Sequence, residues 1–159
     1  MTEVTISTPH HRLKGYVAMP RGDGTWPGVI VLHDSLTDVT RQHADWLAKE
    51  GYLAVAPDLF SWGGRLRCIR ALMVDLSARN GAAFDDVNAV RQWLEGRQDC
   101  TGKTGVIGFC ATGGFAILLA AGRGFSAVAP HYGQGRTISM RYSTAPVRWP
   151  RASAAAIGR

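Results

Sequence analysis

The chain has 159 residues, of which 46% are hydrophobic, and its formal net charge is +6. This length suits one domain with a core large enough to fold without disulfides or metals. No apolar run approaches the roughly 20 residues that a membrane helix needs, and the N-terminal segment lacks the apolar centre of a secretory signal. The three cysteines form no C-x-x-C pair, which argues against a disulfide framework or a zinc site. We therefore expect a soluble, cytoplasmic protein.

The first half of the chain predicts strands around one helix. VTISTP and KGYVAMP alternate apolar and polar residues, which indicates two antiparallel strands. The continuous apolar run over residues 28–33 is typical of a strand buried on both faces. A helix should follow, with Asp38 or Thr40 as its N-cap and Gly51 as its stop. LAVAPDLF then indicates a buried strand that ends at Pro57, and SWGGR a loop.

The second half alternates helices with strands. Helices are predicted over residues 68–78 and in AFDDVNAVRQWLEG, whose apolar residues recur with the helical period. A strand over 103–109, a helix over 113–121 and a strand in FSAVAPHYG complete the pattern. The order β-β-β-α-β-α-α-β-α-β predicts a mostly parallel sheet with helices on both faces. In such sheets ligands bind beyond the carboxyl ends of the strands.

Charge divides the chain into two parts. All twelve acidic residues lie at or before Asp99, whereas only basic residues carry charge from Cys100 onward. Residues 134–159 show no periodicity, so we expect an irregular basic tail after a domain that comprises residues 1–133. Such a tail can bind nucleic acid or a membrane surface. Because its arginines are scattered without aromatic interleaving or a helical stripe, we expect neither partner.

One segment, GVIGFCATGGFAILLAAG, leads from a predicted strand into a predicted helix. It lacks the G-x-G-x-x-G spacing of a dinucleotide site, and the GKT before it precedes the strand, unlike a P-loop. It fits the G-x-S-x-G nucleophile elbow better, with Cys110 as the nucleophile and Thr112 in place of the second glycine. The N–H of Ala111 would then point at the developing oxyanion. A buried structural cysteine is the alternative.

This motif resembles the dienelactone hydrolase family, a cysteine-nucleophile branch of the α/β-hydrolase fold. WPGVIVLHD, EGYLAVAPDLF, DDVNAVRQWL and the strand that ends in HYG extend the resemblance from about Leu13 to Gly133. It implies a three-layer α/β sandwich with a mostly parallel sheet that lacks the family's C-terminal strands. It also implies hydrolysis of small carboxylic esters or lactones by a Cys–His–Asp triad, without a metal or an organic cofactor.

The resemblance places Cys110 on the nucleophile and Ala111 and Ser35 on the two oxyanion donors. Asp34 falls where the family often has an acidic residue near the resting thiol, and capping of the loop explains it equally well. In α/β-hydrolases the acid and the histidine follow the nucleophile in chain order. No acid follows Cys110, and the histidine that does, His131, comes too early in the chain. We therefore expect His131 to line the pocket or to pack at the strand end.

The triad is thus incomplete in this sequence. We expect a cysteine hydrolase with impaired turnover, and a non-catalytic hydrolase-fold remnant or binding module is the alternative. An arrangement with His131 as base and Asp34 as the residue that orients it is a further alternative. The tail after Gly133 would be a truncated end or the product of another reading frame. Missing strands would leave a sheet edge exposed, which predicts self-association.

Overall fold

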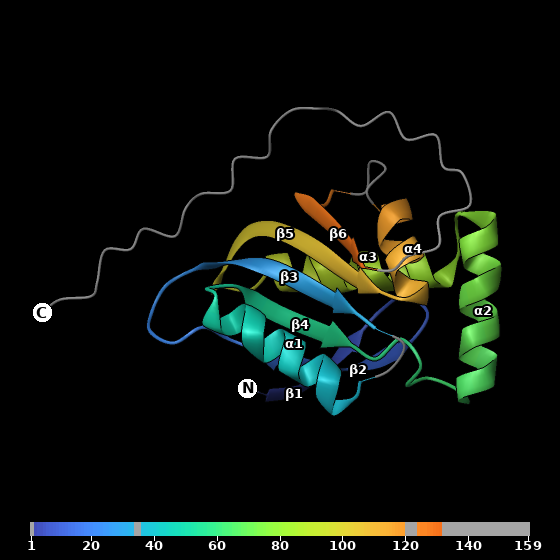
Figure 1. Ribbon diagram of the computed structural model, residues 1–159, viewed down its shortest axis with the longest axis horizontal. Helices are drawn as coiled ribbons and strands as arrows, with labels where there is room; N and C mark the ends of the chain where they lie inside the picture. Colours follow the sequence, from blue (N-terminus) through green and yellow to red (C-terminus); the bar gives the residue numbers. More distant parts are fainter. Residues whose placement is uncertain (1, 34–35, 120–123, 132–159) are drawn as a thin grey trace, which may run out of the picture.

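The computed structural model describes residues 2–33, 36–119 and 124–131, and its elements follow the order that the sequence predicts (Figure 1). The elements are β1 (Thr2–Ser7), β2 (Arg12–Ala18), β3 (Trp26–Leu32), α1 (Asp38–Lys49), β4 (Leu53–Pro57), α2 (Arg65–Ala78), α3 (Ala82–Glu95), β5 (Cys100–Phe109), α4 (Ala111–Leu119) and β6 (Ala127–His131). In this described part no helix is long and apolar enough to cross a membrane.

The described strands form one sheet in the order β1-β2-β4-β3-β5-β6. The pairs β1–β2 and β2–β4 are antiparallel, whereas β4, β3, β5 and β6 run parallel to one another. The mostly parallel sheet predicted from the sequence is therefore confirmed. The carboxyl ends of the parallel strands meet at one edge, where the arrowheads of β3 and β4 point in Figure 1. A ligand site is expected at this edge.

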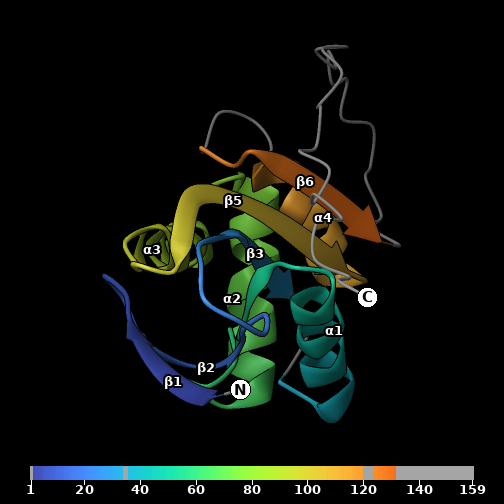
Figure 2. The same ribbon diagram turned by 90° about the vertical axis from the view of Figure 1, so that its left-hand side faces the viewer.

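Helices cover both faces of the sheet. Successive residues of β3 alternate between the faces: Val29 and Val31 pack in a cluster with α1, whereas Ile30 and Leu32 pack with α2, α3 and α4. In Figure 2, α1 and α3 lie on opposite sides of the sheet. The cluster between the sheet and α1 contains many small side chains, such as Ala44 and Ala54, whereas the cluster on the other face contains larger ones, such as Phe84. These three layers form the predicted sandwich.

The ends of the elements differ from prediction by a few residues, for local reasons. The N-cap of α1 is Thr37 rather than Asp38 or Thr40, because the Thr37 hydroxyl accepts the N–H of Thr40 at 3.4 Å. Asp38 instead lies in the first turn, where the helix dipole favours an acid. The predicted stop at Gly51 is confirmed, since its φ of +88° is a conformation that favours glycine.

The helices α2 and α4 and the strand β5 all begin earlier than the sequence predicts. β5 begins at Cys100 rather than at residue 103, because Cys100 pairs with Trp26 of β3. α4 begins at Ala111, directly after Cys110, rather than at residue 113. The connection between β5 and α4 is therefore a single residue, Cys110.

Candidate active site

Cys110 lies in the turn between β5 and α4 with a strained backbone conformation. Its φ is +55°, and Arg79 is the one other non-glycine residue with positive φ in the described ranges. Left-handed backbone is costly for a residue with a side chain, so it persists where the surrounding structure imposes it and is common at functional sites. The conformation is the one that the nucleophile elbow requires.

Of the three cysteines, Cys110 is the exposed one, whereas Cys68 and Cys100 are buried. Cys68 is 2% exposed, and its thiol donates to the Phe60 carbonyl at 3.6 Å. Burial raises the pKa of the Cys68 thiol, which keeps it protonated and unreactive. The structure thus presents one thiol to solvent, and it is the one that the elbow motif selects.

The turn around Cys110 closes because position 108 is a glycine. A Cβ atom on Gly108 would lie 2.3 Å from the Thr112 carbonyl oxygen and 2.9 Å from the Cβ of Ala116. Both contacts are too short for real atoms. The first turns of α4 can therefore pack against the end of β5 only because residue 108 has no side chain.

Two backbone hydrogen bonds fix the turn on either side of the thiol. The Cys110 N–H donates to the His131 carbonyl at 3.0 Å, which ties the turn to the end of β6. The Gly113 N–H donates to the Cys110 carbonyl, also at 3.0 Å, which closes the first turn of α4. The thiol therefore projects from a backbone that is held by both the neighbouring strand and the following helix.

Three histidines surround Phe109, the residue before Cys110. The rings of His43 and His131 stack on Phe109 with centroids 4.6 and 5.1 Å away, and His33 is tilted against it at 5.8 Å. His131 thus lies at the strand end beside the elbow, where it packs on Phe109. His43 comes from α1 and was missed from the sequence, because a lone histidine in an amphipathic helix carries no signal of contact with a distant strand.

His43 is disposed to remain neutral. Its Nδ1 atom is buried and has no hydrogen-bond partner in the described part of the chain. Burial lowers the pKa of His43, and the nearby His33 and His131 lower it further. In the unfolded chain the pKa of a histidine is about 6.5. The unfolded state therefore binds more protons, and stability falls as the pH drops below about 7.

We expect His43→Phe to reduce this acid sensitivity. Phenylalanine keeps a ring beside Phe109 and cannot be protonated, so the variant should lose less stability between pH 7.5 and pH 5.5 than the unmodified chain. The lowered pKa of His43 sets the direction of this difference. Urea unfolding at the two pH values measures it. An equal loss in both proteins would contradict the assignment.

The remaining predicted site residues are placed only in part. Asp34 and Ser35 lie outside the described residues, and their roles stay predictions. Ala111 is the first residue of α4, and N–H groups in a first helical turn have no partner within the helix. Its position suits the predicted oxyanion donor.

No hydrogen bond joins the Cys110 sulfur to an imidazole within the described ranges, and no group there of three or more His, Cys, Asp or Glu residues could hold a metal.

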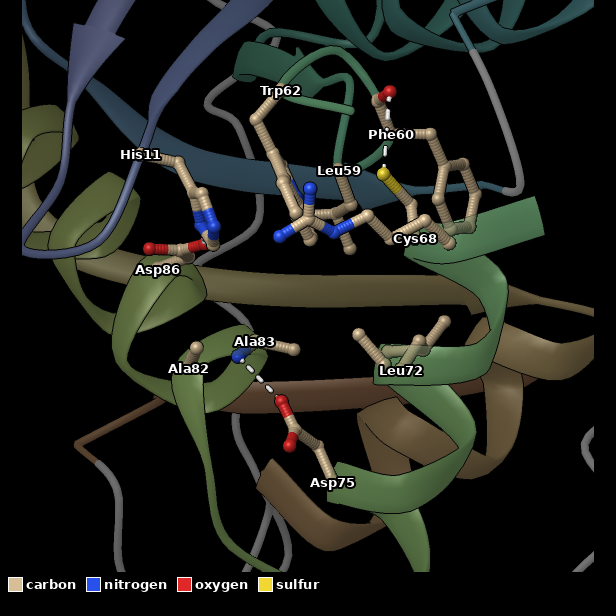
Figure 3. Close-up of a pocket in the computed structure, with 12 residues that line it drawn as sticks. His11, Leu59, Phe60, Trp62, Cys68, Leu72, Asp75, Ala82, Ala83 and Asp86 are labelled. Carbon is tan, nitrogen blue, oxygen red and sulfur yellow. Dashed lines mark hydrogen bonds and ion pairs between the residues drawn. The ribbon is translucent and has the colours of Figure 1, made fainter. Parts of the chain in front are cut away.

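A separate pocket of about 230 Å³ lies between α2, α3 and the loop after β4 (Figure 3). Its lining residues are His11, Leu59, Phe60, Trp62, Arg67, Cys68, Ala71, Leu72, Asp75, Ala82, Ala83 and Asp86. No elbow residue is among them. The Asp75 carboxylate accepts the Ala83 N–H at 2.9 Å, and the Trp62 ring stacks on His11 at 4.0 Å. The first contact joins α2 to α3, and the second joins the loop after β4 to the turn between β1 and β2.

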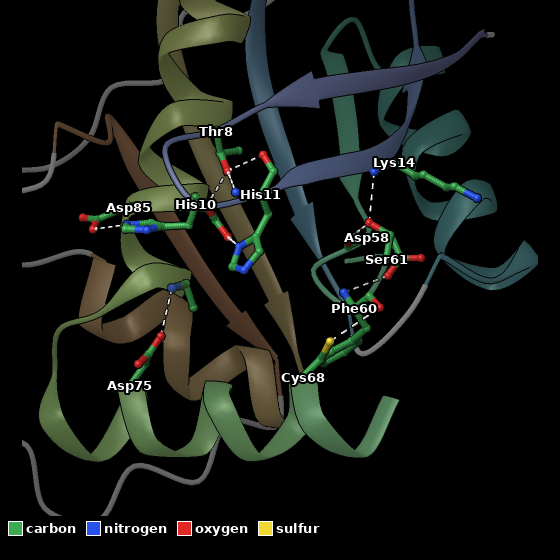
Figure 4. A network of polar contacts seen from close by, with 12 residues as sticks. Thr8, His10, His11, Lys14, Asp58, Phe60, Ser61, Cys68, Asp75 and Asp85 are labelled. Atoms are coloured by element: carbon green, nitrogen blue, oxygen red, sulfur yellow. Dashed lines mark hydrogen bonds and ion pairs between the residues drawn. The ribbon is translucent and has the colours of Figure 1, made fainter. Parts of the chain in front are cut away.

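Two adjacent His–Asp pairs fasten the β1–β2 turn to α3 beside this pocket (Figure 4). His10 Nε2 lies 3.0 Å from Asp85 Oδ2, and His11 Nδ1 lies 2.6 Å from Asp86 Oδ2. Asp86 is 2% exposed, and the Thr8 hydroxyl is also within hydrogen-bond distance of its carboxylate. The buried carboxylate is thereby satisfied, as a charge in the core must be.

The fold agrees with the comparisons to known proteins. The sequence model of the dienelactone hydrolase family matches residues 13–151. The chain belongs to the dienelactone hydrolase family. The match runs past Gly133 into the segment that was expected to be an irregular tail. Residues 132–159 lie outside the described residues, so the domain boundary at 133 stays a prediction.

Curated relatives extend well beyond the part that aligns with this chain. A Yersinia pestis protein whose name marks it as a candidate carboxymethylenebutenolidase is 31% identical over 131 residues, covering 75% of this chain and 48% of its own. Protein usf of Aquifex pyrophilus is 31% identical over 121 residues, which cover 69% of this chain and 50% of that protein. The carboxymethylenebutenolidase of Pseudomonas putida is 29% identical over 119 residues, covering 67% and 50%. The chain thus spans about half the length of these relatives.

Solved structures confirm the predicted α/β-hydrolase fold. A candidate dienelactone hydrolase from Klebsiella pneumoniae superposes with a TM-score of 0.70 at 24% identity, over 88% of this chain and 62% of its own. The dienelactone hydrolase-like promiscuous phosphotriesterase P91, from metagenomic libraries, superposes with a TM-score of 0.64 at 23% identity. The superposition covers 75% of this chain and 52% of that structure. At these identities the likeness shows the fold alone.

Proposed function

We propose that the chain hydrolyses small carboxylic esters or lactones through Cys110, with acylation faster than deacylation. One observation carries the proposal: the single exposed thiol of the chain lies at φ +55° in the one-residue connection between β5 and α4. Family membership supports the same assignment. The name of the Pseudomonas putida relative, a carboxymethylenebutenolidase, points to a lactone as the natural substrate class.

In the first step the Cys110 thiolate attacks the carbonyl carbon of the ester. The carbonyl oxygen becomes an oxyanion, which the Ala111 N–H, and Ser35 as the second donor, would stabilise. Collapse of this intermediate breaks the bond to the alcohol oxygen, which takes a proton from water as it leaves, and the acyl group remains as a thioester on Cys110. In a lactone the alcohol stays tethered to that acyl group.

The second step needs a base that activates water. The family's acid and histidine follow the nucleophile in chain order, and no Asp or Glu follows Asp99 in these 159 residues. His131 packs on Phe109 at the end of β6. We therefore expect the thioester to hydrolyse slowly, so that the first turnover is much faster than those that follow.

The reaction with p-nitrophenyl acetate tests the proposal. The unmodified chain should release about one equivalent of p-nitrophenolate in a burst, followed by slow turnover. Cys110→Ala should lose the burst, with a fall in rate of about 100-fold or more, because the nucleophile itself is removed. Cys68→Ala is the matched control, since its buried thiol should leave the burst unchanged.

Two outcomes would contradict the proposal. A burst that persists in Cys110→Ala would assign the chemistry to another residue. The absence of any burst from the folded, unmodified chain would favour the non-catalytic remnant or binding module.

A further inference from the structure

We propose that the Thr112 hydroxyl is a positioning group that locks the Cys110 elbow to the end of β3, in place of the second glycine of the elbow motif. The inference rests on the proposed function of Cys110 and concerns how its conformation is held. Thr112 lies in the first turn of α4, two residues after the nucleophile. It is 0% exposed, so its hydroxyl must find its partners within the protein.

The hydroxyl makes three short contacts with backbone groups. Its oxygen lies 2.7 Å from the Phe109 carbonyl and 2.8 Å from the Leu32 carbonyl, and it accepts the Phe109 N–H at 3.2 Å. A hydroxyl has one proton to donate and two lone pairs to accept with. It therefore donates to one of the two carbonyls at a time while it accepts from Phe109. The Thr112 side chain therefore contacts both the N–H and the carbonyl of Phe109, the residue before the nucleophile.

Because the Leu32 carbonyl belongs to β3, the Thr112 hydroxyl also links two strands. Leu32 is the last residue of β3, and it pairs with Gly108 of β5 in the parallel sheet. Leu32 is 80 residues away in sequence from Thr112. The hydroxyl thus ties three pieces together: the end of β3, the end of β5 and the start of α4. Cys110 lies in the middle of them.

The lock acts on the peptide that sets the conformation of Cys110. The Phe109 carbonyl belongs to the peptide that ends at the Cys110 N–H, and this N–H donates to the His131 carbonyl. Thr112 and His131 therefore hold opposite sides of the same peptide plane. With this plane fixed, the φ of +55° at Cys110 cannot relax toward an ordinary value.

A side chain is tolerated at position 112 because the close approach in the turn is made at Gly108. An added Cβ on Gly108 would meet the backbone of Thr112, at 2.3 Å from its carbonyl oxygen and 2.8 Å from its carbonyl carbon. The crowded side of Thr112 is therefore its carbonyl, whereas its side chain points toward β3. A glycine at position 112 would fill the same turn without supplying the hydroxyl.

Thr112→Val and Thr112→Ser separate the hydroxyl from the shape of the side chain. Valine keeps the branched shape and removes the hydroxyl, whereas serine keeps the hydroxyl and removes the methyl group. Two quantities are measured in each folded protein: the rate of acylation of Cys110 by p-nitrophenyl acetate, and the hydrogen-exchange rate of the Phe109 amide by NMR. Protection of the buried Cys68 from iodoacetamide confirms that each variant is folded under the conditions used.

We expect Thr112→Val to acylate about 10-fold or more slowly, because small displacements of a reacting group have effects of this size or larger. Its Phe109 amide, which loses its acceptor, should exchange about 10-fold or more faster. Thr112→Ser should stay within about threefold of the unmodified chain in both quantities. A role of the shape of the Thr112 side chain alone would not predict this rescue by the hydroxyl, and a role in global stability alone would not change the acylation rate of the folded protein.

The inference is overturned if Thr112→Val acylates and exchanges at the unmodified rates, or if Thr112→Ser is as impaired as Thr112→Val. If the valine variant does not fold, Thr112→Ala replaces it in the comparison with serine, with the same expectations and the same contradicting results. If the unmodified chain is not acylated at all, the proposed function fails separately. The Phe109 exchange rates then still decide the inference.

Discussion

Gly108→Ala is expected to lower the free energy of unfolding by about 3 kcal/mol or more, at the upper end of the cost of overpacking. The added Cβ would lie 2.3 Å from the Thr112 carbonyl oxygen, which is backbone in the first turn of α4. This oxygen cannot retreat as a flexible side chain would, so α4 must move away from the end of β5. The elbow should open, and the acylation of Cys110 should fall with it.

Gly105→Ala is the matched control for this substitution. Gly105 lies on the same strand, but a Cβ there would meet the Ala127 carbonyl oxygen at 3.4 Å and the Ala127 Cβ at 3.6 Å, which are ordinary contacts. We expect a change within about 1 kcal/mol. Urea unfolding followed by circular dichroism measures both variants. Equal stability of the two would show that the close approach at Gly108 does not constrain the turn.

Phe115→Ala is expected to cost about 3–5 kcal/mol of stability, the usual range for a buried phenylalanine. Phe115 is fully buried on α4, and the centroid of its ring lies 4.4 Å from the ring centroid of Phe84 on α3. Truncation leaves a cavity between two helices that cover the same face of the sheet. Because α4 carries the elbow at its N-terminus, its packing on α3 also supports the site.

Leu66→Ala provides the control for side-chain truncation. Leu66 lies on α2 and is 85% exposed, so its loss should change stability by no more than about 0.5 kcal/mol. The midpoints of urea unfolding for the two variants give the comparison. A loss below about 1 kcal/mol in Phe115→Ala would mean that α4 does not pack on α3 as the structure has it.

The elements could be predicted because their signals are local. The unbroken apolar run of β3 reflects burial under helices on both faces, and the helical period of α3 reflects its single buried face. The start of β5 could not be predicted in this way, because it depends on the pairing of Cys100 with Trp26. Such pairing joins residues far apart in sequence and leaves no pattern in either segment.

The site was predictable to the same extent. The small residues around Cys110 identify the turn, since the close approach at Gly108 excludes a side chain. The bond from Thr112 to Leu32 spans 80 residues, and the stacking of His43 on Phe109 joins α1 to β5. Neither is visible before the chain is folded. The sequence points to Cys110 as the proposed nucleophile, whereas the groups that hold it in place emerge only from the tertiary structure.

Identification of the acylated residue tests the central claim most directly. The folded chain is treated with p-nitrophenyl acetate, quenched in acid during the burst and digested with trypsin. Cleavage after Lys103 and Arg123 releases residues 104–123, whose one cysteine is Cys110. We predict an acetyl group on this peptide, at the sulfur of Cys110, and none on the peptides that carry Cys68 or Cys100. An acetyl group on any other residue, or none at all, would contradict the assignment of Cys110 as the nucleophile.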